Sequence, residues 1–150
     1  MRIRYPAGTH INGPADTKEL IVTKDPASSA KGAGKTQQIN ERGQNKCELQ
    51  FETEYLLPRK MSGEYIEYWF EPWTFRLADR CTYRPDYVAQ RADGRFDIFE
   101  CKIRYKNGKL QTTGDAAVKI RLFPEIWPQF DYYLAVREGT TGRLVIRKQN

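Results

Sequence analysis

Two β-rich runs within residues 82–104 flank a turn signal, and this stretch constrains the fold more than any other part of the chain. The turn signal is Asp93-Gly94, a dipeptide typical of β-hairpins. Glu100 and Lys102 lie two positions apart in the second run, so their side chains share one face of the strand. Asp86 lies in the first run. The stretch therefore predicts a hairpin that carries two acids and a lysine.

The length of the turn decides whether Asp86 faces Glu100. A two-residue turn would place Asp86 opposite Cys101, on the wrong face of the hairpin. A three-residue loop, residues 92–94, would instead place the two carboxylates opposite each other, with Cβ atoms about 5 Å apart. That loop needs a left-handed residue at its last position, and Gly94 supplies it.

Two carboxylates at that distance repel each other unless a cation lies between them. Mg²⁺ prefers oxygen ligands and is usually bound by one or two carboxylates together with waters and a phosphate oxygen. A bound metal lowers the pKa of a water and offsets charge that develops on a phosphate. Lys102 could orient or help to deprotonate that water. The hairpin therefore suggests a metal-dependent phosphodiesterase.

The alternative is an ordinary hairpin with a surface ion pair worth ~0.2–1 kcal/mol. Glu100 and Lys102 lie among Phe96, Ile98, Phe99, Cys101 and Ile103. Charges in so apolar a strand are costly unless they are paired or bind a metal. This context favours the functional interpretation.

Composition excludes several other kinds of site. The chain has 150 residues, which favours one domain. Its only histidine is His10, and its three cysteines, Cys47, Cys81 and Cys101, have no C-x-x-C spacing. We expect the cysteines to be reduced and buried, and we expect neither a zinc site of histidine and cysteine nor a histidine-based triad.

The net charge of +6 at pH 7 favours nucleic acid or an anionic surface as a partner. No run approaches the ~18 apolar residues of a membrane span. No apolar stretch follows the basic N-terminal residues, as it would in a secretory signal. We expect a cytoplasmic protein that does not bind membranes.

Residues 1–44 are dominated by Gly, Pro, Ser, Lys and Gln. Because such a stretch buries little apolar surface, it predicts a disordered or loosely attached tail. Residues 32–36, Gly-Ala-Gly-Lys-Thr, match half of a phosphate-binding P-loop. Ser29 stands where the full motif needs glycine, and no apolar helix follows, so a flexible linker is favoured over a nucleotide site.

Residues 45 to about 61 predict the first helix, with Asn45 as N-cap and Glu48 at the capping-box position. Pro58 is expected to bend or end it. Two roles are open for Glu48: a capping carboxylate, or an additional acid turned toward the hairpin.

Residues 64–78 alternate with a period of two and predict a strand, with a bulge or an edge position at Pro72. Its aromatic side chains are expected mostly in the core, with a stacking platform for bases as the alternative.

The stretch after the hairpin begins with a basic loop, residues 105–113. A second helix should follow, with Asp115 as N-cap and its end by about Trp127. Its apolar residues at helical spacing are Val118, Leu122 and Ile126. Residues 130–136 predict a buried strand, and residues 143–147 a last edge strand. The expected order is helix, three strands, helix, strand, strand.

These features resemble the PD-(D/E)xK nuclease superfamily. Pro85-Asp86 matches its first motif, and Glu100-Cys101-Lys102 its second. The resemblance covers about residues 45–137 and is greatest to small phage nucleases, including Holliday junction resolvases, and to transposon-encoded end-nicking nucleases. It implies an α/β fold with a restriction-endonuclease-like αβββαβ core, a mixed central sheet flanked by helices, in a nuclease domain of residues 45–150. The wider matching pattern comprises Glu71-Pro72, Leu77-Ala78, Tyr83, Pro85-Asp86-Tyr87, Asp93-Gly94 and Glu100-Cys101-Lys102.

The resemblance also implies roles for individual residues. Asp86 and Glu100, with the backbone carbonyl of Cys101, would bind Mg²⁺ or Mn²⁺, and Lys102 would be the catalytic lysine. The glutamate that many members add from the first helix best matches Glu48, with Glu52 as the second choice. Two positions depart from the family, because relatives often have valine at Cys101 and glycine at the position after Lys102.

The basic residues around the hairpin suggest a path for DNA. Such phosphate contacts would give salt-dependent, largely sequence-independent binding. Lys119 is the favoured contact, and the alternative is a solvated loop and helix face. The candidates are Arg84, Arg104, Lys106, Lys109, Lys119 and Arg121, besides Lys102 itself.

The first hypothesis is therefore a Mg²⁺-dependent DNA endonuclease, phage-encoded and acting in the host cytoplasm, with branched DNA such as a Holliday junction among its expected substrates. Junction resolution requires two coordinated cuts and predicts a homodimer. The alternatives are a non-catalytic DNA-binding or assembly protein on a nuclease-like fold, a transposon-type end-nicking nuclease, and an interaction protein with a basic surface.

Overall fold

The computed structural model describes residues 39–149. The predicted tail lies outside this range up to residue 38, as does the glycine-rich segment 32–36. The last residues of the predicted tail, 39–44, are described and contact the domain. Gln44 is buried and donates a hydrogen bond to Tyr87 Oη at 2.5 Å, and Arg42 forms an ion pair with Glu52 at 2.8 Å. The segment 39–44 is therefore anchored by its polar side chains.

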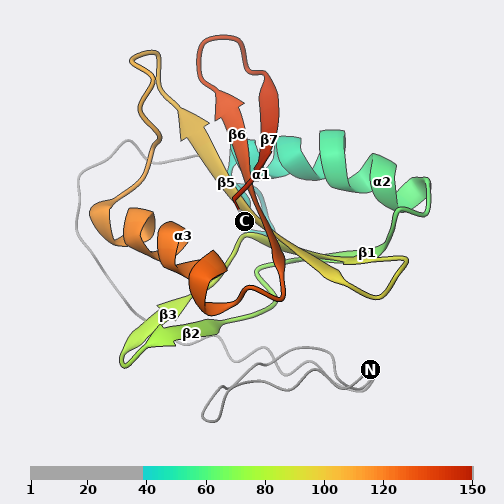
Figure 1. Cartoon of the computed structure of the whole chain (residues 1–150). Helices are drawn as coiled ribbons and strands as arrows, with labels where there is room; N and C mark the ends of the chain where they lie inside the picture. Colours follow the sequence, from blue (N-terminus) through green and yellow to red (C-terminus); the bar gives the residue numbers. More distant parts are fainter. Residues whose placement is uncertain (1–38, 150) are drawn as a thin grey trace.

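The fold is mixed α/β, as expected, and is built on a five-stranded mixed sheet in the order β1-β4-β5-β6-β7 (Figure 1). The central pair β5 and β6 is parallel, and the other neighbours are antiparallel. The parallel pair is joined through helix α3. The strands are β1 Tyr65–Phe70, β4 Tyr87–Arg91, β5 Phe96–Arg104, β6 Asp131–Glu138 and β7 Leu144–Lys148.

The first helix begins as predicted. Asn45 is its N-cap, and the reciprocal capping box with Glu48 is present. The helix runs through α1 Lys46–Phe51, a π-helical segment η1 Glu52–Leu56, and α2 Leu57–Met61. Pro58 does not end it. The wider turns of η1 lie directly before this proline, which has no backbone N–H to donate, and the helix continues to Met61.

Residues 64–78 do not form one interrupted strand, so that prediction is wrong. The chain turns away from the main sheet after β1 at Glu71, which has a left-handed φ of 47°, and at Pro72. It then forms β2 Phe75–Ala78, which pairs with β3 Cys81–Tyr83 in a separate two-stranded sheet. Within β1 the register shifts at Ile66, and this extra residue is 56% exposed.

The hairpin of β4 and β5 has the three-residue loop that the turn chemistry favours. Arg91 N–H donates to the Arg95 carbonyl at 2.8 Å, and Gly94 takes the left-handed conformation with φ of 83°. The register pairs Tyr87 with Phe99. The paired ladder ends there, one residue before Asp86 and Glu100.

Helix α3, Gly114–Ile126, differs from its prediction at its start and in its buried face. Its N-cap is Thr113, whose hydroxyl accepts from Ala116 N–H, and not Asp115. It ends at Trp127 as expected, with Pro124 inside it.

The expected apolar face of α3 is largely exposed. Val118 is 46% exposed and Ile126 is 36% exposed, whereas Ile120 and Phe123 are buried. The aromatic side chains of the neighbouring segments explain the difference. The ring centroids of Phe75, in the small sheet, and Phe123 lie 4.9 Å apart. This contact buries the face of α3 that carries Phe123.

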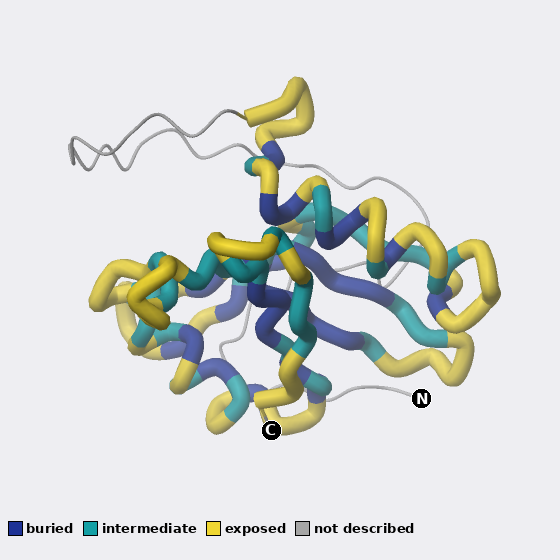
Figure 2. Tube along the Cα trace, turned by 90° about the horizontal axis from the view of Figure 1, so that it is seen from above, coloured by how far each residue is buried: buried dark blue, intermediate teal, exposed yellow. Residues whose placement is uncertain are grey.

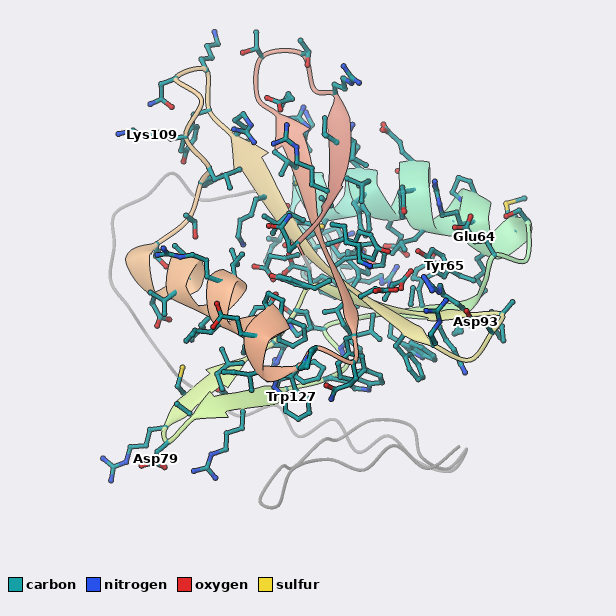
Figure 3. The ribbon with its side chains drawn as sticks, in the orientation of Figure 1. Glu64, Tyr65, Asp79, Asp93, Lys109 and Trp127 are labelled. Carbon is teal, nitrogen blue, oxygen red and sulfur yellow. The ribbon has the colours of Figure 1, made fainter. Side chains whose placement is uncertain are left out.

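Two hydrophobic cores lie on opposite faces of the main sheet. Adjacent residues of β5 show this, since Ile98 belongs to the core beneath α3 and the small sheet, and Phe99 to the core beneath α1. Buried residues run along the sheet and the inner helix faces in Figure 2. Most of the aromatic residues that were expected in the core are buried or partly buried there. Trp127, for example, lies between α3 and the small sheet (Figure 3).

The expectation that the cysteines are buried holds for two of the three. All three cysteines are free, with Cys47 and Cys101 buried and Cys81 partly exposed. Within residues 39–149, no helix has the length and apolar character needed to span a membrane.

Candidate active site

The structure brings Asp86, Glu100 and Lys102 together where β4 begins beside β5. Lys102 Nζ forms an ion pair with Glu100 Oε1 at 2.5 Å. Asp86 Oδ2 accepts a hydrogen bond from the Cys101 backbone N–H at 2.6 Å. Asp86 is thus hydrogen-bonded to the backbone of Cys101, the residue between Glu100 and Lys102. The three ionisable side chains therefore lie close together on the sheet.

Tyr83 holds the Glu100 carboxylate, and Tyr132 in turn contacts Tyr83. Tyr83 Oη donates to Glu100 Oε2 at 2.6 Å and lies 2.9 Å from Tyr132 Oη. Burial first, and then the charge of Glu100, raise the pKa of both tyrosines, so both hydroxyls keep their protons. Glu100 itself is 6% exposed and therefore has a fixed position.

Sequence reasoning missed the role of these tyrosines. In the sequence, Tyr83 is only part of a motif and Tyr132 only part of a buried strand. A usable signal was present, because a buried tyrosine hydroxyl usually finds a hydrogen-bond partner. Which partner it finds depends on the tertiary fold, since β3 and β6 are brought together only by the packing of the small sheet and α3 against the main sheet.

Glu48 has the capping role considered for it, and it lines one cavity together with Lys102, while its role as an additional acid of the site stays a prediction. Its Oε2 accepts from Asn45 N–H at 2.7 Å, which completes the helix cap. It is also buried beside the cluster: burial first, then the charges of Glu71 and Glu100, raise its pKa, while Lys102 lowers it. The first turn of α1 therefore places a carboxyl group beside the cluster.

Glu52, the second choice, belongs to a separate cluster. It is buried, accepts hydrogen bonds from Arg42, Gln44 and Tyr68, and anchors the segment before α1. Burial alone would raise the pKa of Glu52, but these hydrogen bonds outweigh it and lower the pKa below its usual value. The structure thus selects Glu48 and not Glu52 as the neighbour of the hairpin acids.

Burial and neighbouring charges change the pKa of the acids and of the lysine in the site. Burial first, then the charge of Glu100, hold the pKa of Asp86 well above its usual range, and Lys102 opposes the shift. For Lys102, burial alone would lower the pKa, but Glu100 and Asp86 outweigh it and raise it. The lysine therefore stays protonated, and one cation faces the carboxyl groups of Glu48, Asp86 and Glu100.

The donor set has the chemistry of a site for a hard divalent cation. Asp86 and Glu100 offer carboxylate oxygens. The Cys101 N–H points toward Asp86, and because N–H and C=O of one residue point to the same side of an extended strand, its carbonyl faces this edge as well. As the side chains stand, no group of three or more His, Cys, Asp or Glu residues within 39–149 is arranged to hold a metal ion. Oε1 of Glu100 is bound by Lys102 and Oε2 by Tyr83, so binding would require Lys102 to turn away from Glu100.

The basic residues fall into two groups. Arg84 and Lys119 line a cavity of about 190 Å³ together with Glu100, so they lie beside the cluster. Each has an acidic neighbour: Arg84 lies 3.9 Å from Glu71, and Lys119 2.8 Å from Asp115.

The second group does not line that cavity. Arg104 pairs with Glu138 at 3.2 Å, and Arg121 is exposed on α3. Lys106 and Lys109 are exposed on the loop between β5 and α3, where Figure 3 labels Lys109. The structure therefore gathers only Arg84 and Lys119 at the hairpin acids.

Comparison with known proteins adds no assignment: no family model matches the chain, and no curated protein or solved structure matches it. The candidate site is defined by its own residues and geometry.

Proposed function

We propose that the protein is a divalent-metal-dependent DNA endonuclease of the PD-(D/E)xK type, which hydrolyses phosphodiester bonds. The observation that carries this proposal is the convergence of Asp86, Glu100 and Lys102 on one edge of a buried strand, with Glu48 beside them. The fold supports it. A helix precedes the antiparallel strands β1, β4 and β5, and α3 leads to the parallel strand β6, as a restriction-endonuclease-like core requires.

Each residue has a distinct part in the proposed mechanism. Asp86, Glu100 and the Cys101 carbonyl would hold Mg²⁺ or Mn²⁺, which supplies an activated water and offsets charge on the phosphate. Lys102 donates hydrogen bonds to the charge that develops on the scissile phosphate and orients the attacking water. Tyr83, which in turn contacts Tyr132, fixes the orientation of Glu100.

DNA would approach across the edge that bears Arg84 and Lys119. Both side chains line the cavity next to Glu100, so a phosphate bound between them lies beside the proposed metal ligands. Lys106 and Lys109 would extend the basic surface along the backbone on either side of the cut.

The test is cleavage of labelled linear, nicked, forked and four-way-junction DNA with Mg²⁺ or Mn²⁺. Lys102→Ala should lower the rate by about 100-fold or more. The control, Arg143→Ala, removes an exposed positive charge that lies outside the proposed DNA path and should cleave close to the wild-type rate.

Two results would contradict the proposal. Equal background cleavage by wild type and Lys102→Ala would show that the site is not catalytic. Salt-dependent DNA binding that persists in Asp86→Asn, without cleavage by the wild type under any divalent ion, would favour a non-catalytic DNA-binding protein on a nuclease-like fold.

A further inference from the structure

A cavity of about 380 Å³ opens between the start of α1, strand β5 and the loop from β5 to α3. Glu48 and Lys102 of the candidate active site form one part of its wall, and Tyr105 and Gln111 of the loop form another. The volume is in the range of ~300–1,000 Å³ typical of pockets that bind small ligands. The cavity is thus continuous with the proposed catalytic residues but is not used by the mechanism above.

The wall of the cavity changes in chemistry with distance from Lys102. Lys102 can contact a phosphate, whereas Ile103, Leu110 and the side chains of the loop provide neutral surface. Tyr105 is 49% exposed and is the only exposed aromatic residue in the part of the chain that the structure describes. Large aromatic side chains are otherwise at least partly buried there, so an open ring beside a cavity indicates a surface for stacking.

The loop also presents a hydrogen-bonding group without a protein partner. The side-chain amide of Gln111 makes no hydrogen bond with any residue in 39–149, although its backbone N–H donates to the Ile103 carbonyl at 2.7 Å. An amide has both donors and an acceptor, which matches the edge of a nucleobase.

Backbone hydrogen bonds define the course of the loop that carries these groups. Tyr105 N–H donates to the Lys109 carbonyl at 2.8 Å, and Gly108 N–H to the Tyr105 carbonyl at 2.9 Å. Gly139, in the turn between β6 and β7, donates to the Arg104 carbonyl at 2.8 Å. Figure 1 shows the loop extending beyond the end of β5 before it returns to α3. A preorganised wall lowers the entropy cost of binding.

We propose, resting on the nuclease function above, that this cavity binds one unpaired nucleotide of the DNA, next to the scissile phosphate. Its phosphate contacts Lys102, its base stacks on Tyr105, and Gln111 hydrogen-bonds to the base edge. A base inside a duplex is stacked between its neighbours and cannot enter a cavity of this size without leaving the helix. The preferred substrates are therefore DNAs in which a nucleotide is already unpaired at the cut, such as forks, flaps and branch points.

Two measurements on the full chain test this inference. The first is metal-free binding, by fluorescence anisotropy, of a forked DNA and of a blunt duplex with the same sequence. Tyr105→Ala should weaken fork binding by about tenfold, because stacking on an aromatic ring contributes ~1–3 kcal/mol per base. It should leave duplex binding within about twofold. Tyr105→Phe keeps the ring and should bind the fork as wild type does.

The second measurement is Mg²⁺-dependent cleavage of the same two DNAs. Faster cleavage of the fork by wild type, with the preference lost in Tyr105→Ala and kept in Tyr105→Phe, supports the assignment. Cleavage of both DNAs with no effect of Tyr105→Ala on either overturns it and leaves the nuclease proposal standing. If the protein binds the fork through Tyr105 but does not cleave DNA, only the proposed catalysis is overturned. If it shows neither cleavage nor Tyr105-dependent fork binding, both the nuclease proposal and the nucleotide-binding proposal are overturned.

Discussion

Removal of one hydroxyl, in Tyr83→Phe, should measure how strongly the buried shell holds Glu100. Tyr83 Oη donates to Glu100 Oε2 at 2.6 Å, and both residues are nearly fully buried, at 5% and 6% exposure. Water therefore cannot take the place of the lost donor. The phenylalanine ring can keep the contacts of the tyrosine ring with Phe123 and Tyr132, whose centroids lie 5.2 Å and 6.3 Å away, so no large cavity forms.

The variant loses the hydrogen bond to the charged Glu100, worth about 1.5–3 kcal/mol in the free energy of unfolding, and also the hydrogen bond with Tyr132 Oη, so the cost should be at least that amount. For a chain of this length, each kcal/mol lowers Tm by roughly 2–4 °C. The assay is urea denaturation of wild type and variant, with equal m-values as the sign that only stability has changed.

The matched control is Tyr105→Phe. It removes from an exposed tyrosine a hydroxyl that makes no hydrogen bond to residues 39–149, so the free energy of unfolding should stay within about 0.5 kcal/mol of wild type. A double-mutant cycle of Tyr83→Phe with Glu100→Gln then isolates the pairwise energy. If Tyr83→Phe cost no more than Tyr105→Phe, the reasoning that Tyr83 positions Glu100 would be refuted.

Three further changes have outcomes that follow from the structure. Glu52 has a lowered pKa, so its ion pair with Arg42 contributes stability above the usual glutamate pKa of 4.5, and this stability is lost as pH falls through the lowered value. The difference in thermal stability between wild type and Glu52→Gln should therefore shrink on acidification. A difference that stays constant with pH would contradict the pairing. Phe99→Ala should cost about 3–5 kcal/mol in urea denaturation, because Phe99 is fully buried at the centre of the α1 core, and a cost under about 1 kcal/mol would be inconsistent with that packing. Lys119→Ala should weaken DNA binding about equally for all sequences and reduce the slope of log K against log salt by about 1, whereas an unchanged slope would remove Lys119 from the DNA path.

The hairpin is the part of the fold that the sequence predicts best, because its determinants are local. The period of two, the left-handed requirement at Gly94 and the loop length set the register without help from the rest of the chain. The capping box of Asn45 and Glu48 is predictable for the same reason. The placement of Asp86, Glu100 and Lys102 follows from these short-range rules.

The features that sequence reasoning missed depend on contacts between distant segments. Pro72 signals an interruption, but only the packing of Phe75 and Leu77 under α3 decides that the chain starts a second sheet there. The same packing selects Phe123 over Val118 as the buried face of α3. The hydroxyl shell around Glu100 is likewise invisible in the spacing of residues.

The hydrogen bond between Gly139 and Arg104 means that a residue outside the cavity loop affects the position of this loop. A Cβ at residue 139 would lie 2.7 Å from the Arg104 carbonyl oxygen, closer than real Cβ atoms approach, so even alanine would force the two turns apart. The contact lies at the end of β5 from which the loop departs, and displacement there would shift Tyr105 relative to Lys102. Under the proposed function, a methyl group outside the acid cluster would thus change which DNA shapes are preferred while leaving the hairpin register intact.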